Sequence, residues 1–206
     1  MVEVQVSTYP ALVAGKRRGR TRTCARARVV VGFRSTGPQR PRTHLGRSLV
    51  SEPLVRQEDC LACDLTSGVA PLPGGRVHQT LFWVVEHCVG PLGVGTLLVK
   101  PFRHVVSMGL LTDRESAELG PLLQRVSAAV SRIVRAEQVY VCQWSHSGGV
   151  PGHLHFVVQP VTSKQMRRFN AYGPALQVAM FKDGPTPDPN EVKDICDRYR
   201  LLLDAP

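Results

Sequence analysis

No run of eighteen or more apolar residues occurs in this 206-residue sequence, so we expect no helix that spans a membrane. The first twenty residues place their charge after their apolar stretch, the reverse of the order in a secretory signal. The six cysteines lack the spacing of a disulfide framework. We therefore expect a protein of the reducing cytoplasm.

Acidic residues are nearly absent from the start of the chain. Residues 1–50 hold eleven Lys and Arg against one acid, Glu3, whereas residues 51–206 hold fifteen basic and fifteen acidic residues. The net charge of +10 therefore belongs to an N-terminal arm. Such an arm can bind nucleic acid or anionic lipid, or it can be a solvated segment without a partner. A site that stacks nucleic-acid bases needs aromatic residues among its basic ones. This arm has few, so a solvated segment without a partner is favoured.

Sustained periodicity is also missing from residues 1–52, which are rich in Arg, Gly, Ser, Thr and Pro. We expect this arm to be largely disordered, with the segment ARVVVGF at most an isolated strand. One domain with its own core is expected to begin near Glu52.

Strand-forming segments follow this arm. Runs of β-branched and aromatic residues predict four strands, at residues 77–87, 96–101, 137–145 and 153–161. The turn GPLGVG joins the first two in a hairpin.

Helical periodicity appears between the second and third predicted strands. Apolar residues at helical spacing predict a helix of about 24 residues, opened by a capping box of Thr112 and Glu115. Pro121 marks a point where this helix can bend. Weaker helical patterns follow the last strand, the final one capped by Asp188 ahead of Pro189. The predicted fold class is α+β: an antiparallel sheet backed by one long helix, with further helices at the end.

Two histidines stand one residue apart in the segment SGGVPGHLHFVVQP, residues 147–160. Strand residues i and i+2 share a face, so His153 and His155 are expected to point the same way. Neighbouring imidazoles repel once protonated, and such a pair is typical of a metal or catalytic site. The alternative is two half-buried histidines bonded to backbone carbonyls.

Cys60 and Cys63 have the C-x2-C spacing of half a zinc site. A redox pair, or two cysteines at this spacing by chance, are the alternatives. A zinc site would need two further ligands.

Together these motifs resemble the histidine triad (HIT) superfamily of nucleotide hydrolases and transferases. The hairpin GPLGVGTLLVKPFRHV resembles the family's Pro, Gly, apolar strand, Pro, basic residue, His stretch. The segment LTDRESAELGPLLQRV resembles its next helix, and HLHFVVQP resembles its alternating histidine strand. The resemblance covers about residues 58–162. It implies three parts: the arm at 1–52, a HIT-like domain at 53–162 and a helical extension at 163–206.

In metal-binding branches of this superfamily, the C-x2-C pair, the histidine after the hairpin and the first histidine of the strand hold zinc. The resemblance implies that Cys60, Cys63, His104 and His153 do so here. Two thiolates and two imidazoles make a closed set, so the zinc would be structural.

His155 matches the family's nucleophile, which attacks the α-phosphorus of a nucleotide to give a nucleotidyl-histidine intermediate. The segment Ser147, Gly148 and Gly149 would then present N–H groups to phosphate, although Ser-Gly-Gly can also be a simple turn. Ser145 or Ser147 could add a hydroxyl.

The third histidine of the triad is missing, because Val157 occupies its place. Gln159, the next polar residue on that face, is expected either to contact phosphate or to end the strand. In a rival alignment, His153 is the nucleophile and His155 the third histidine. The first alignment is preferred because it supplies the fourth zinc ligand.

Further expectations concern a general acid and the residues that contact the nucleobase. His146 can be a general acid or a solvated loop residue, and Gln143 is the nearest counterpart to the family's polar residue ahead of the glycine loop. Either Trp83 or Phe82 is expected to face a nucleobase, with the other packed below the long helix.

The sequence thus predicts an enzyme that hydrolyses or transfers nucleotides, dinucleoside polyphosphates among them, at the α-phosphate. The alternatives are a zinc-stabilised nucleotide-binding module with little turnover, and a nucleic-acid-associated protein that uses the arginine arm. A homodimer is expected from the resemblance.

Overall fold

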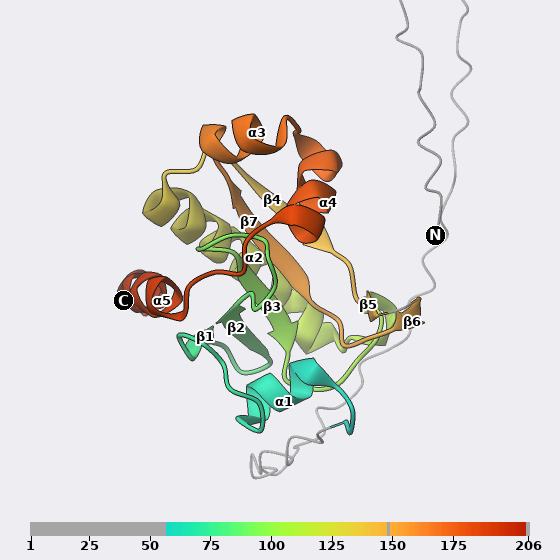
Figure 1. The fold of residues 1–206 in the computed structure, drawn as a ribbon. Coiled ribbons are helices and arrows are strands. Elements are labelled where there is room, and N and C mark those ends of the chain that lie inside the picture. The colour runs from blue at the N-terminus through green and yellow to red at the C-terminus, as the bar shows by residue number, and fades with distance from the viewer. Residues whose placement is uncertain (1–56, 148, 205–206) are drawn as a thin grey trace, which may run out of the picture. The chain divides into compact units, whose positions relative to one another are not determined.

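The computed structural model describes residues 57–147 and 149–204 (Figure 1). The predicted arm at 1–52, its isolated strand ARVVVGF and the domain start near Glu52 lie outside the described residues.

Five strands form one antiparallel sheet, in the order β1-β2-β3-β7-β4 (Figure 1). These strands are β1 (Arg76–Gln79), β2 (Trp83–His87), β3 (Leu97–Pro101), β4 (Gln138–Gln143) and β7 (Phe156–Val161). The loop between β4 and β7 contains a separate two-stranded ladder of β5 (His146–Ser147) and β6 (Val150–Pro151). The predicted α+β class and antiparallel sheet are confirmed.

Residues 77–87 are not one strand, as their composition predicted, because a turn divides them into β1 and β2. The Thr80 hydroxyl accepts hydrogen bonds from the N–H groups of Phe82 (3.4 Å) and Trp83 (3.1 Å). The Thr80 N–H in turn donates to the Trp83 carbonyl at 2.9 Å. A side-chain oxygen that satisfies local N–H groups competes with strand pairing, so the chain reverses here despite its β-branched composition.

The strand predicted at 153–161 begins only at Phe156. Ahead of it, the Leu154 N–H donates to the Val105 carbonyl at 2.7 Å, and the His155 N–H donates to the Ser145 hydroxyl at 2.9 Å. Individual hydrogen bonds to separate loops therefore hold Leu154 and His155, and His153 and His155 precede the paired strand, so its alternation does not govern their directions.

The long helix α2 runs from Asp113 to Val134 and continues through Pro121. Its predicted capping box is confirmed: the Thr112 hydroxyl accepts from the Glu115 N–H, and the Glu115 carboxylate accepts from the Thr112 N–H. The remaining helices are α1 (Leu61–Ser67), the 3-10 helix η1 (Met108–Leu110), α3 (Ser163–Phe169), α4 (Gly173–Asp183) and α5 (Pro189–Leu203). None of the helices between residues 57 and 204 that the structure describes is long and apolar enough to cross a bilayer.

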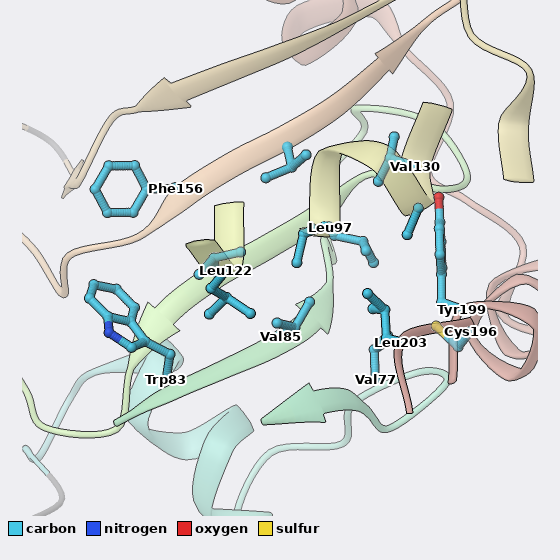
Figure 2. Close-up of a cluster of buried hydrophobic side chains, with 14 of the residues drawn as sticks. Val77, Trp83, Val85, Leu97, Leu122, Val130, Phe156, Cys196, Tyr199 and Leu203 are labelled. Atoms are coloured by element: carbon cyan, nitrogen blue, oxygen red, sulfur yellow. The ribbon is translucent and has the colours of Figure 1, made fainter. Parts of the chain in front are cut away.

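The main hydrophobic core lies between the sheet, α2 and α5. Figure 2 shows Trp83 and Phe156 at one end of it and Tyr199 from α5 at the other. The Trp83 indole N–H donates to the Glu115 carbonyl of α2, and the Tyr199 hydroxyl donates to the Gly95 carbonyl. Both buried aromatic residues therefore satisfy their polar atoms, as burial requires.

A second core lies on the other face of the sheet. There Val157 and Val161 of β7 pack with Leu176 and Met180 of α4. Side chains of β7 thus alternate between the two cores, with Phe156 and Val158 in the first. The C-terminal helices contribute to both faces of one sheet.

Candidate functional site

Four side chains come together at one end of the sheet: Cys60, Cys63, His104 and His153. One ligand atom from each lies within 4.8 Å of the other three. The Cys63 Sγ is 3.4 Å from the Nδ1 atoms of both His104 and His153, and the Cys60 Sγ is 3.8 Å from the His153 Nδ1. Zinc bonds of about 2.3 Å to sulfur and 2.0–2.1 Å to nitrogen, at tetrahedral angles, would separate sulfur from nitrogen by roughly 3.5 Å. The donor set and its spacing therefore fit a tetrahedral metal ion.

Three parts of the chain supply these ligands. Cys60 is the N-cap of α1 and Cys63 lies in its first turn, while His104 follows β3 and His153 precedes β7. Only the fold brings these segments together, because 41 residues separate Cys63 from His104 and 90 separate it from His153.

The orientation of His153 suits a metal ligand. Its Nε2 lies 2.9 Å from the Pro101 carbonyl, so Nε2 carries the proton and Nδ1 faces the other three ligands. Burial lowers the pKa of His153 to about 4, which keeps the imidazole neutral at pH 7. A neutral imidazole with its second N–H bonded to a carbonyl is the usual form of a metal-binding histidine.

A buried ion pair supports the cysteine-bearing helix, and the sequence reasoning missed it. The Lys100 ammonium donates to the Ala62 carbonyl at 2.8 Å and pairs with the Glu86 carboxylate. Thr66 of α1 donates its hydroxyl to the same carboxylate at 3.3 Å. In the hairpin register Glu86 lies opposite Leu98 and Lys100 opposite Val84. Opposite charges inside two otherwise apolar strands were the signal that could have revealed this pair.

His155 lies beside this cluster but makes different contacts. Its Nδ1 is 3.0 Å from the His153 carbonyl, a position that requires the proton on Nδ1 and leaves the Nε2 lone pair unused. Its backbone N–H is bonded to the Ser145 hydroxyl, which also accepts from the Gln143 side chain at 2.8 Å. The Ser145 hydroxyl, which was predicted to contact phosphate, thus accepts a hydrogen bond from the backbone of His155.

The other predicted phosphate-binding residues lie in different surroundings. Gly149 occupies the turn of the β5-β6 ladder with φ +83°, whereas Gly148 and the Ser147 and His146 side chains lie outside the described residues. Gln159 is fully buried: its Nε2 donates to the Met180 sulfur, and its Oε1 accepts from Gln177. Gln159 therefore contacts α4 where phosphate was expected, and it does not end β7, which continues to Val161.

A cavity of about 480 Å³ adjoins His155. Its lining consists of Cys88, Leu92, Leu98, Cys142, Trp144, His155, Val157, Gln177, Val178, Phe181 and Lys182. Trp83 packs below α2 as predicted, but Phe82 packs against the same core, so neither aromatic residue lines this cavity. Trp144 and Phe181 do. The sequence reasoning missed Phe181 because α4 follows the segment on which the family resemblance rests, and it missed Trp144 because it looked for the aromatic residue in the strand-like run that contains Phe82 and Trp83.

Comparison with solved structures identifies the fold as that of histidine triad proteins. A zinc-bound histidine triad family protein from Mycobacterium smegmatis is 19% identical, with TM-score 0.51 over 71% of this chain and 94% of that one. A HIT-like protein from Bartonella henselae, described as involved in cell-cycle regulation and holding an unknown ligand, is 16% identical, with TM-score 0.53 over 71% and 98%.

A hypothetical histidine triad nucleotide-binding protein from Sulfolobus tokodaii is 17% identical, with TM-score 0.55 over 70% of this chain and 92% of that one. No family model and no curated protein matches the sequence. The predicted histidine triad fold is confirmed.

Proposed function

We propose that this protein is a zinc-containing enzyme that hydrolyses or transfers nucleotides at the α-phosphate, with His155 as the nucleophile. The observation that carries the proposal is the hydrogen bond from the His155 Nδ1 to the His153 carbonyl. This bond fixes one tautomer, so Nε2 can attack phosphorus without first losing a proton.

In the first step, a bond forms between Nε2 and the α-phosphorus while the bond from phosphorus to the leaving-group oxygen breaks. That oxygen departs with the electron pair. Water or another acceptor then attacks phosphorus, the P–N bond breaks and its electron pair returns to Nε2. When water is the acceptor, its proton goes to solvent and the product is a nucleoside monophosphate.

Zinc held by Cys60, Cys63, His104 and His153 would be structural, because four protein ligands complete a tetrahedral set. It would tie α1 to the loop that carries His153. Since the His153 carbonyl accepts a hydrogen bond from the His155 Nδ1–H group, the same loop would orient the nucleophile.

Val157 stands beside His155 in the cavity and has no proton to give a departing group. Leaving groups that depart as stable anions, such as nucleoside polyphosphates, should therefore react faster than amines, which need protonation. The protein should prefer dinucleoside polyphosphates to nucleoside phosphoramidates.

The test is a panel of such substrates combined with mass spectrometry of the intact protein. We expect a nucleotidyl adduct that His155→Ala abolishes and that His78→Ala, which changes a histidine bonded to Asp204, leaves intact. Turnover by His155→Ala at the wild-type rate would refute the proposal.

The absence of a histidine at position 157 favours a second candidate, a nucleotide-binding module with little turnover. Under this alternative the wild-type protein would bind nucleotide at equilibrium yet form no adduct and release no product with any member of the panel.

A further inference from the structure

The helix α1, which positions both cysteines, is too short to be stable alone. It has seven residues, and Cys63 and Leu65 are the buried ones. Helices of this length are marginal in water without tertiary contacts, and one of the two buried side chains is itself a metal ligand. The position of the thiols therefore depends on other contacts between α1 and the sheet.

Lys100 of β3 and Glu86 of β2 supply such contacts. The Lys100 ammonium donates to the carbonyl of Ala62, which lies between the two cysteines, at 2.8 Å. The Glu86 carboxylate accepts from the hydroxyl of Thr66, one turn further along α1, at 3.3 Å. Because Lys100 and Glu86 also pair with each other, each side chain fixes the other where it meets α1.

Both charged side chains stand on the face of the sheet that is opposite to the main core. In the register of β2 and β3, Lys100 lies opposite Val84 and Glu86 lies opposite Leu98. Cross-strand partners share a face, so the ion pair runs diagonally across one face of the two strands. The neighbouring Val85 belongs to the main core. The pair therefore contacts α1 on the side of the sheet that α2 does not cover.

The stability of the sheet alone does not explain why these two positions are charged. Each side chain is only 1% exposed, so both ions lose their hydration. Apolar residues of similar volume often give equal or greater stability at such positions. Apolar side chains, however, could neither donate to the Ala62 carbonyl nor accept from the Thr66 hydroxyl. The contacts with α1 are what only the charged pair can provide.

We propose that Lys100 and Glu86 are positioning residues of the metal site, which hold α1 so that its two thiols face the two histidine ligands. This assignment rests on the zinc site of the proposed function and not on the reaction at His155. Metal–ligand distances vary by only about 0.2 Å in proteins. A small shift of α1 would therefore take the thiols out of bonding distance, so the pair should determine how tightly zinc is held.

The test is competition for zinc between the zinc-loaded full chain and a chromophoric chelator. The double variant Lys100→Met with Glu86→Leu leaves no buried charge without its partner, so it should fold. We expect its zinc affinity to fall about tenfold to a hundredfold, the loss typical of removing groups that orient metal ligands. Thr66→Val keeps the ion pair and removes only the hydroxyl, and it should weaken zinc binding about two- to tenfold.

Cobalt substitution provides a readout that a loss of stability alone would not change. Co²⁺ can occupy tetrahedral cysteine-histidine sites, and its charge-transfer absorption reports the bonds to sulfur. At saturating Co²⁺, the double variant should show weaker sulfur-to-cobalt absorption than the wild-type protein, because its thiols are no longer held towards the metal.

The matched control is Leu203→Ala in the main core, on the other face of the sheet from the ion pair. Leu203 is 3% exposed, so its truncation should lower the free energy of unfolding and leave the zinc affinity and the cobalt spectrum unchanged. Lys193→Met, which removes an exposed ion pair with Asp197, should likewise leave both unchanged.

Wild-type zinc affinity in both the double variant and Thr66→Val would overturn the positioning role, as would an equal loss of affinity in Leu203→Ala. A wild-type chain that binds neither Zn²⁺ nor Co²⁺ would overturn the zinc site together with this role. Failure of the enzyme is distinguishable from either result. Weakened zinc binding in the double variant, with no nucleotidyl adduct in the wild-type protein, refutes only the enzyme.

Discussion

The Lys100 ammonium lies 2.5 Å from the Glu86 carboxylate, and each side chain is only 1% exposed. The same ammonium donates to the carbonyl of Ala62, a residue between the two cysteines of α1. Removing two charges from water costs several kcal/mol per ion, and their attraction offsets this only when both are present. The pair therefore links the stability of the sheet to the position of the cysteine-bearing helix.

Replacing one member of this pair should destabilise the protein strongly. Lys100→Met leaves a buried carboxylate without its cation and removes one of two side-chain hydrogen bonds to the Ala62 carbonyl, so we expect the free energy of unfolding to fall by about 3–5 kcal/mol. Urea unfolding followed by circular dichroism measures this loss. The double variant Lys100→Met with Glu86→Leu removes both charges and should be more stable than Lys100→Met alone.

The matched control for this experiment is Lys193, whose ion pair with Asp197 lies on the exposed surface of α5. Lys193→Met should leave the free energy of unfolding unchanged within error. If Lys100→Met behaves like this surface variant, the buried pair does not support the fold.

Metal analysis tests the cysteine-histidine cluster separately from activity. We expect about one zinc per chain, which Cys60→Ser and His104→Ala should remove. Cys142→Ser should retain the metal, because this cysteine lies outside the cluster. Protein with intact thiols and good activity but no zinc would contradict the zinc assignment.

The family resemblance predicted four metal ligands, and the structure brings these four side chains together. Their proximity could be predicted because the resemblance combines the local spacing of C-x2-C and the two histidines with the order of strands in a known fold. The same reasoning was wrong about the direction of Gln159. Val157, Gln159 and Val161 share a face of β7, but whether that face meets solvent depends on α4, which the strand pattern does not contain.

The aromatic residues predicted to face the nucleobase also show that the strand pattern does not determine contacts with distant segments. Trp83 and Phe82 stand in a strand-like run, but the Thr80 hydroxyl makes a turn there, and both rings pack against the main core. A side chain from a distant helix, Phe181, lines the cavity instead. Contacts between segments far apart in sequence depend on packing, and local periodicity carries no information about them. The homodimer and a nucleic-acid role for residues 1–50 stay predictions.

His87 should make stability depend on pH independently of the metal ligands. Burial lowers its pKa below the ordinary value of 6.5, and its Nε2 accepts a hydrogen bond from the Gly95 N–H at 2.9 Å. Below pH 6.5 the unfolded chain takes up a proton that the folded state resists, so stability should be full above this pH and fall as the pH decreases.

Urea unfolding at pH 7.5, 6.5 and 5.5 measures the effect of His87. His87→Gln should flatten the decline over this range, although His153, whose pKa is also lowered, keeps part of it. Equal slopes for the two proteins would mean that His87 does not carry the expected difference in proton binding.

Ser145 should position the nucleophile without contacting substrate. Its hydroxyl accepts the His155 N–H at 2.9 Å and the Gln143 amide at 2.8 Å. Ser145→Ala leaves a partly buried N–H without its acceptor, at a cost of about 1–3 kcal/mol, and allows the His155 backbone to shift. A displacement of 1 Å at a reacting atom can lower the rate by about a hundredfold.

We therefore expect Ser145→Ala to lower kcat by tenfold to about a hundredfold while the equilibrium affinity for AMP stays near the wild-type value. Ser145→Thr keeps the accepting oxygen and should recover part of the rate. The control is Ser163→Ala, which removes an exposed hydroxyl bonded to Glu137. It should leave kcat and the affinity for AMP unchanged. Should Ser145→Ala turn over as fast as the wild-type protein, the hydroxyl would be a structural detail of the loop, and His155 would owe its orientation to the His153 carbonyl alone.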